Sequence, residues 1–362
     1  MYKDLTGGRD DAAVLITGGA GFIGTNLAHR VLRDGGSVVI LDNLSRSGVA
    51  ENIAWLHEMH SSGVRLLVSD IRDRDAVRRA VRGVRRVFHF AAQVAVTSSL
   101  CDPRADFETN VVGTMNVLEA IRSLNNPPPL LYTSTNKVYG GLDDVALDSR
   151  DSRYEPRDAS IGAHGIDEGR GLAFHTPYGC SKGAADQYVL DYSRSFGIQS
   201  VVFRMSCIYG PHQFGCEDQG WVAHFLMRAS EGEPITIYGS GKQVRDVLFV
   251  EDLVEAMLAA HEHLDITAGQ AFNIGGGPKN TISLLELTDL IGRFNGTAPE
   301  LRFAEPRQGD QRYFVSDVSK FFSLTGWRPR TSVVEGVSRL NEWLPERRSR
   351  IPVIAHAGRV SA

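Results

Sequence analysis

A run of glycines directly after the first apolar segment constrains the fold of this chain more than any other feature of its sequence. The segment AAVLIT is followed by TGGAGFIG, where three glycines stand three residues apart and a shifted trio beginning at Gly19 fits Gly-x-Gly-x-x-Gly. Glycine lets the backbone turn tightly and approach a pyrophosphate at a helix N-terminus. The pattern predicts a strand, a dinucleotide-binding turn and a helix, with candidate contacts at Gly18, Gly21, Phe22, Ile23 and Gly24.

Short β-branched runs alternate with longer helical patterns through the first two-thirds of the chain. Such alternation predicts a parallel sheet with helices on both faces, so the expected fold class is α/β: a doubly wound, Rossmann-like parallel sheet with a smaller C-terminal α/β domain. The expected helices include Arg74–Val81, Arg104–Ser123 and Tyr178–Phe196. The expected strands are 12–17, 37–42, 64–70, 85–92, 129–135 and 199–206.

The length of 362 residues suggests two domains. After Tyr209 the pattern loosens, and ITIYGSGKQVRDVLFVEDLVEAMLAA indicates a strand, a glycine turn, a strand and a helix. We expect residues 12–208 with about 241–274 to bind a dinucleotide, and about 209–240 with 275–345 to form the substrate domain. The weakly patterned residues 346–362 are expected to be a flexible tail.

The end of the second predicted strand favours NAD as the cofactor. Asp42 in VVILDN is placed to accept hydrogen bonds from the ribose hydroxyls and to repel a 2′-phosphate. Arg46 nearby leaves NADP open, and a glycine turn without a ligand is the remaining alternative. Asp70 after the third strand is placed to meet the adenine edge or to cap a helix. The other candidate cofactor contacts are Asn43, Ile71, Ala91, Ala92, Gln93, Asn110, Thr133, Tyr178 and Lys182.

A tyrosine and a lysine stand four apart in HTPYGCSK, one helical turn from each other. Tyrosine is a poor base at neutral pH because its reference pKa is about 10. The ammonium of Lys182 and an oxidised nicotinamide would stabilise the phenolate of Tyr178, and the hydroxyl of Thr135 would bind the reacting substrate oxygen. These parts suit proton removal from an alcohol as hydride leaves. Alone, the Tyr–Lys spacing would equally fit an exposed helix.

The stretches TGGAGFIG, STNKVYG and YGCSK resemble the extended short-chain dehydrogenase/reductase family of nucleotide-sugar enzymes over most of the chain. The resemblance implies tightly bound NAD that is regenerated in each cycle, a nucleoside-diphosphate-sugar substrate and a homodimer formed through the helices Arg104–Ser123 and Tyr178–Phe196. It implies that Asn110 supports the site. It also implies the catalytic triad Thr135, Tyr178 and Lys182, and a grip on the nucleotide by Arg245, Arg307 and Asp310.

The residues after Thr135 argue against loss of water from the sugar. The 4,6-dehydratases of the family carry an Asp-Glu pair where this chain has Asn136 and Lys137. The stretches DNLSR, STNKVYG, DQGWV and GKQVRDVL resemble the CDP-paratose 2-epimerases, also called CDP-tyvelose epimerases, which implies inversion at C2 through a 2-keto sugar. Further substrate contacts are expected at Asn136, Met205, Cys207, Gln219 and Val222. A 4-epimerase of UDP- or dTDP-sugars remains the main alternative, and a silent NAD-sensing protein is a weaker one.

The composition excludes several other classes. A net charge of −4 with mixed signs predicts no nucleic-acid partner. No apolar run approaches the roughly 18 residues of a membrane span, so no membrane partner is expected. The four cysteines are scattered without metal-like spacing, which predicts no metal site and a reducing, cytoplasmic setting.

Overall fold

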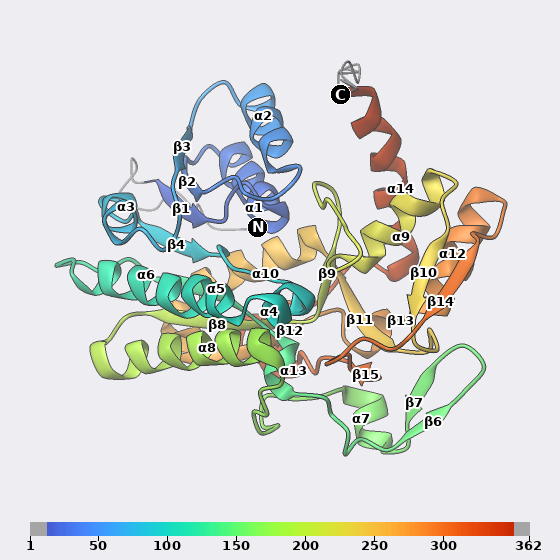
Figure 1. Ribbon diagram of the computed structural model, residues 1–362. Coiled ribbons are helices and arrows are strands. Elements are labelled where there is room, and N and C mark those ends of the chain that lie inside the picture. The colour runs from blue at the N-terminus through green and yellow to red at the C-terminus, as the bar shows by residue number, and fades with distance from the viewer. Residues whose placement is uncertain (1–12, 351–362) are drawn as a thin grey trace.

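The computed structural model describes residues 13–350 and the side chains of residues 13–344. Its larger part is a seven-stranded parallel sheet (Figure 1) in the order β12-β8-β5-β4-β1-β2-β3. The order steps outward from β1 in both directions, which confirms the doubly wound sheet; the edge strand β12 was not identified from sequence. The strands are β1 Val14–Thr17, β2 Val38–Asp42, β3 Val64–Val68, β4 Arg86–His89, β5 Leu130–Thr135, β8 Ser200–Met205 and β12 Gln270–Ile274.

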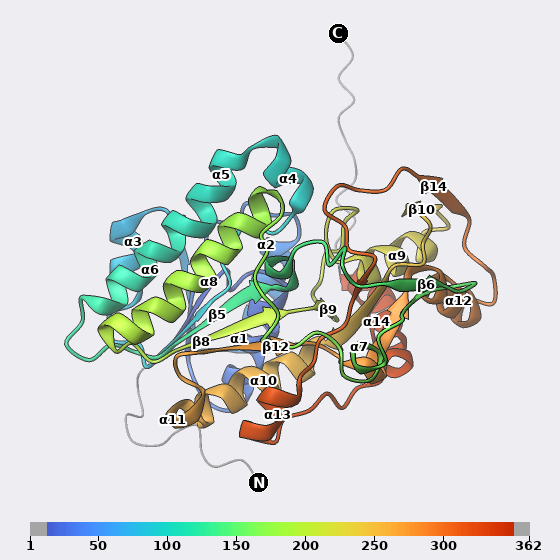
Figure 2. The same cartoon turned by 90° about the horizontal axis from the view of Figure 1, so that it is seen from below.

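Helices cover both faces of this sheet (Figure 2). Val14 and Ile16 of β1 face one hydrophobic layer and Leu15 faces the other, as the two-residue period of a strand requires. The first layer contains α1 Phe22–Arg33, α2 Val49–Met59 and α10 Val250–Glu262. The second contains α3 Arg74–Ala80, α6 Gly113–Arg122 and α8 Thr176–Phe196.

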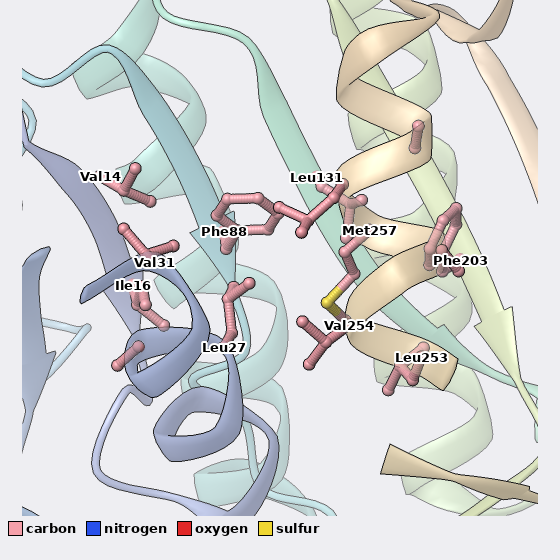
Figure 3. Close-up of a cluster of buried hydrophobic side chains, with 14 of the residues drawn as sticks. Val14, Ile16, Leu27, Val31, Phe88, Leu131, Phe203, Leu253, Val254 and Met257 are labelled. Atoms are coloured by element: carbon pink, nitrogen blue, oxygen red, sulfur yellow. The ribbon is translucent and has the colours of Figure 1, made fainter. Parts of the chain in front are cut away.

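The first of these layers shows why a late segment of the chain returns to the sheet. Figure 3 shows side chains from three neighbouring strands, Phe88, Leu131 and Phe203, in one cluster with α10. Met257 of α10 is fully buried there. Burial of a side chain of this kind contributes about 2 kcal/mol, so α10 is anchored on the sheet although the strand before it, β11 Val244–Phe249, is not part of that sheet.

The helix predicted at Arg104–Ser123 is interrupted by a π-turn. It consists of α5 Pro103–Phe107, the π-turn η1 Glu108–Val112 and α6, and the short helix α4 Val96–Cys101 precedes it. Asp102 begins α5 by accepting a hydrogen bond from the backbone N–H of Ala105 at 2.9 Å. Turns of this type occur frequently at functional sites, and this one carries Asn110.

A smaller part lies beyond the carboxyl ends of the large sheet and contains small sheets and the helices that pack on them. β11 pairs with β9, β13 and β15, and β10 pairs with β14. The division into two domains stays a prediction, because α13 Ser319–Thr325 contacts β12 of the large sheet while β11 joins the small one. The elements are β9 Cys207–Tyr209, α9 Trp221–Ser230, β10 Ile235–Tyr238, β11 Val244–Phe249, β13 Thr281–Ser283, α12 Leu284–Asn295, β14 Leu301–Ala304, β15 Tyr313–Phe314 and α14 Val333–Arg350.

The segment between β5 and α8 includes the hairpin and the helix at the lower edge of Figure 1, where the hairpin packs against β15 of the smaller part. It consists of the turn η2 Asn136–Tyr139, the hairpin β6 Leu147–Ser149 and β7 Tyr154–Pro156, and α7 Ala159–His164. Of the predicted tail, residues 346–350 continue α14, and residues 351–362 lie outside the described part of the chain. Within residues 13–350, no helix is both long and apolar enough to cross a bilayer.

Two buried histidines predict a loss of stability in mild acid. Burial lowers the pKa of His89 and of His261 to about 3, and both ring nitrogens of His261 are buried without a hydrogen-bond partner. Below the unfolded value of about 6.5 the unfolded state binds more protons, so stability present above that pH is lost as the pH falls toward 3. At pH 5 each histidine is expected to cost about 2 kcal/mol. Urea unfolding at pH 7 and pH 5 measures the loss, and His261→Leu should remove its own share; an unchanged pH dependence would contradict this.

Candidate active site

The glycine turn between β1 and α1 has the geometry that the sequence predicted. Gly18 has a φ of +67°, and a Cβ there would stand 2.6 Å from the backbone nitrogen of Ala91 at the end of β4. A Cβ on Gly24 would stand 2.5 Å from the Cα of Gly19. Only glycine permits these close approaches. Gly21 caps α1, so the helix N-terminus opens at the turn, and Phe22 and Ile23 form its first turn.

Asp42 lies at the carboxyl end of β2 and holds the glycine turn. Its carboxylate accepts hydrogen bonds from the backbone N–H of Ala20 at 3.0 Å and of Leu44 at 2.9 Å. Burial raises the pKa of Asp42. The glycine cradle and this carboxylate fit the pyrophosphate and ribose of NAD, because each carboxylate oxygen keeps a further lone pair for a ribose hydroxyl.

The next candidate contacts divide between the site and the core. Asp70 accepts hydrogen bonds from Asn43 at 3.0 Å and from the guanidinium of Arg72, which holds the pKa of Asp70 well below its usual range. The helix-cap alternative for Asp70 is wrong, since Asp73 caps α3. The side chain of Ile71 is buried in the core beneath α6, and its backbone carbonyl accepts a hydrogen bond from the side chain of Asn116 at 3.1 Å. A cofactor contact by Ile71 stays a prediction.

The segment after β4 is fastened by the π-turn. Gln93 and Asn110 exchange hydrogen bonds through the Gln93 backbone, at 2.8 and 3.0 Å. Asn110 also donates to the hydroxyl of Ser181 in α8 at 3.0 Å. The side chain of Asn110 thus joins the strand-end residues Ala91, Ala92 and Gln93 to the helix that carries the Tyr–Lys pair.

We expect Gly24→Ala to lose bound NAD, because the added methyl meets backbone atoms that cannot move aside. The measurement is the amount of NAD per chain after gel filtration, read by chromatography of the denatured protein. Gly171→Ala is the matched control, since a Cβ there meets nothing within 4 Å. Full NAD content in Gly24→Ala would contradict the predicted cradle.

Three predicted catalytic residues lie together at the end of β5. Thr135 is the last residue of that strand, and its hydroxyl donates to the side-chain oxygen of Asn136 at 3.3 Å. Tyr178 lies in the first turn of α8. Lys182, one turn later, donates to the carbonyl of Thr133 at 2.6 Å. Its ammonium stands 4.2 Å from the ring centroid of Tyr132. The structure thus brings the triad and Thr133 to one edge of the sheet.

The electrostatics differ from the expectation of a lowered tyrosine pKa. Burial raises the pKa of Tyr178 to about 12, with the Thr135 side chain opposing it, and burial lowers the pKa of Lys182 to about 7. The ammonium of Lys182 bonds the Thr133 carbonyl. Protein groups alone therefore favour the protonated phenol, and the charge of a bound oxidised nicotinamide would act against this.

A cavity of about 240 Å³ opens between the end of β5 and the smaller part. Its wall includes six of the predicted substrate contacts: Asn136, Cys207, Gln219, Arg245, Arg307 and Asp310. Arg245 donates to the carboxylate of Asp310 at 2.7 Å. Across the cavity wall, the guanidinium of Arg307 stacks 3.9 Å from the ring centroid of Tyr238 and donates to the carbonyl of Glu217 at 2.7 Å.

Two other predicted substrate contacts do not line the described cavity wall. The side chain of Val222 is buried in the core of the smaller part, and a substrate contact by this residue stays a prediction. Met205 ends β8 beside Thr135 and packs against the sheet core, away from the described cavity wall.

Sequence reasoning missed several residues of the cavity wall. Trp221 had a signal, because it follows the loop residue Gln219 in DQGWV, whereas Tyr238 had none beyond ending a strand. The missed wall residues include Val96, Thr97, Trp221, His224, Phe225, Tyr238 and Gln243.

The small residues after Lys182 pack against groups of the same chain. A Cβ on Gly183 would stand 2.3 Å from the ring of Phe174. Ala185 is buried in the sheet core. The absence of a side chain at Gly183 and the small side chain of Ala185 therefore allow close packing within one subunit.

Comparison with known proteins gives a consistent result. A model of the NAD dependent epimerase/dehydratase family matches residues 14–275. CDP-paratose 2-epimerase from Salmonella typhi is 43% identical over 337 residues, which cover 91% of this chain and 98% of that protein. Among solved structures, UDP-glucose 4-epimerase from Thermus thermophilus in complex with NAD superposes with a TM-score of 0.76 at 32% identity, covering 91% of this chain and 98% of that one. UDP-glucose 4-epimerase from Thermotoga maritima with UDP-glucose gives 0.79 at 29% identity, covering 92% and 99%.

Proposed function

Because the chain belongs to the NAD-dependent epimerase/dehydratase family, we propose that it is a nucleotide-sugar epimerase that inverts C2 of a CDP-linked sugar. The reaction passes through a 2-keto sugar and needs no net oxidant, since the hydride removed from one face returns to the other. The choice of C2 and of CDP is supported by the 43% identity with a CDP-paratose 2-epimerase over nearly the whole of both chains.

One observation carries epimerisation over dehydration. Elimination of water needs an acid and a base beside the keto sugar, yet Asn136 and Lys137 follow Thr135 on the cavity wall. The side chain of Asn136 donates to Gln311, and the nearest wall carboxylate in the described chain, Asp310, is paired with Arg245. This wall would hold a sugar through hydrogen bonds, and the carboxylates on its described part are paired: Asp310 with Arg245, and Glu217 and Asp218 with Arg307.

The catalytic roles follow from the positions of the side chains. Tyr178 would take the proton of the reacting hydroxyl as the sugar is oxidised and give it back after the ketone has turned. Thr135 would donate a hydrogen bond to the same oxygen, and Lys182 would supply positive charge behind the phenol. NAD, held by the glycine cradle and Asp42, would supply the acceptor and donor of hydride. Arg245 and Arg307 would bind the diphosphate, for which a guanidinium fork is suited.

The direct test incubates purified protein with CDP-, UDP-, GDP- and dTDP-sugars and follows inversion by NMR. Inversion at C2 of a CDP-sugar is expected. The same reaction in D₂O should leave the inverted carbon without deuterium, since the hydride never exchanges with solvent. If CDP-sugars stay untouched while a UDP- or dTDP-sugar inverts at C4, the alternative 4-epimerase is correct; deuterium at the inverted carbon would contradict hydride return.

The same proposal includes a homodimer in the cytoplasm. Large apolar side chains are exposed along α4, the α5–η1 helix and α8, which lie on one side of the sheet in Figure 2. Leu100, Phe107, Val112 and Tyr188 are between 39% and 52% exposed. These side chains supply apolar area for a second copy. Sedimentation is expected to show a dimer, which Phe107→Glu should weaken; a wild-type monomer would contradict it.

A further inference from the structure

Lys137 lies on the cavity wall two residues after Thr135, and the proposed reaction gives it no role. Its side chain is 19% exposed, and its ammonium donates to the carbonyl of Gly309 at 3.0 Å. The carboxylate of Asp310 stands 3.8 Å away. An ammonium has three N–H groups. Even with both neighbours served, one N–H remains to donate into the cavity.

Among the Lys and Arg side chains on the described cavity wall, Lys137 has the positive charge that nearby carboxylates neutralise least. Asp310 is 2.7 Å from Arg245 and 3.8 Å from Lys137, so a single carboxylate serves two cations. Arg307 has two carboxylates of its own, at 3.5 and 3.6 Å. Lys137 therefore contributes the positive charge that most needs an oxygen ligand.

The backbone contacts of Lys137 place it at the reacting end of the cavity. Its N–H donates to the Thr135 hydroxyl at 3.2 Å, and its carbonyl lies 3.4 Å from where a Cβ of Gly179 would stand. A Cβ on Gly309, which binds the ammonium, would stand 2.7 Å from the side chain of Thr176. Gly179 and Thr176 flank the catalytic tyrosine, whereas Arg307 stacks on a ring of the smaller part.

We propose that the Lys137 ammonium contacts the sugar itself, donating a hydrogen bond to an oxygen next to the reacting carbon, and so helps to determine which sugars the cavity accepts. The inference rests on the proposed function, because it needs a nucleotide sugar in this cavity. Burial and the nearby Arg245 lower the pKa of Lys137 to about 8, against the effect of Asp310, and the amine therefore stays largely protonated at neutral pH.

The test compares binding of CDP-glucose and of CDP to the NAD-containing protein by calorimetry at pH 7. Removing a hydrogen bond from a charged donor is expected to weaken CDP-glucose binding by about 10- to 100-fold in Lys137→Met. Binding of CDP, which has no sugar, should change by less than about twofold. Lys137→Arg keeps the charge and should recover part of the loss, whereas the neutral Lys137→Gln should not.

Two results would overturn the proposal. An equal loss for CDP and CDP-glucose would make Lys137 a diphosphate contact, and no loss for either would exclude a ligand contact. Lys279→Met is the matched control, because Lys279 is exposed and does not belong to the described cavity wall. Thermal unfolding verifies that each variant folds. If Lys137→Met does not fold, Lys137→Gln is used in its place. Because binding needs no turnover, the comparison of the two ligands can be interpreted even if C2 inversion is not observed. If the wild type prefers uridine nucleotides, UDP-glucose and UDP are used in place of CDP-glucose and CDP.

Discussion

Tyr178→Phe is expected to lower turnover by about 10³-fold, which corresponds to about 4 kcal/mol in the barrier. The substitution removes only the phenol hydroxyl, and the ring stays buried at the start of α8. Without a group to take the hydroxyl proton, loss of hydride would leave a protonated ketone, and the positive charge that develops in the transition state raises the barrier. NMR of the sugar product measures the loss, while NAD content and thermal unfolding are expected to stay near wild type.

The control for this variant is Tyr154→Phe, which also removes a single phenol hydroxyl. Tyr154 lies on β7, and its hydroxyl is 3.2 Å from that of Ser240 at an exposed position. Wild-type turnover is expected there. If Tyr178→Phe turned over as fast as the control, another group would be the base, and the catalytic assignment of the Tyr–Lys pair would be wrong.

Arg204→Met is expected to destabilise the fold by about 3–5 kcal/mol, because it leaves a buried carboxylate without its partner. Arg204 on β8 binds Asp186 of α8 through two hydrogen bonds, at 2.9 and 3.0 Å, and Asp186 is fully buried. The guanidinium also donates to the hydroxyl of Tyr139 at 3.2 Å, which in turn donates to Asn273 at 2.8 Å. The network joins α8 to the turn after β5, so the free energy of unfolding measured in urea should fall steeply.

Two further variants sharpen this stability test. Arg293→Met breaks an ion pair with Asp289 within α12, and the two side chains are 68% and 72% exposed. It should change the free energy of unfolding by no more than about 0.5 kcal/mol. Adding Asp186→Leu to Arg204→Met removes the orphaned charge and should restore part of the stability. A loss as small as that of Arg293→Met would show that water reaches Asp186 and that the pair is not buried in solution.

The local motifs were predictable because short-range geometry decides them. A strand followed by closely spaced glycines can only turn tightly, and a four-residue spacing on a helix puts Tyr178 and Lys182 on one face. Asp42 followed from the position of a strand end. The doubly wound order of the sheet also followed, since alternating strands and helices have few compatible arrangements.

The π-turn at Asn110, the burial of Val222 and the raised pKa of Tyr178 were beyond sequence reasoning. Each depends on neighbours far along the chain: Asn110 bonds Ser181, 71 residues away. Sequence spacing indicates which residues share a helix face, but it does not indicate which other element of the fold packs against that face.

The sequence by itself therefore determined the cofactor turn, the catalytic spacing and the class of sheet, because each is set within a few residues of backbone. Only the tertiary structure decided the cavity wall. It brought Gly309, 172 residues away, onto the ammonium of Lys137, and it set Arg245 and Lys137 on the same carboxylate of Asp310. Charges interact through space, so their partners and their strength were settled by packing between the two parts of the fold.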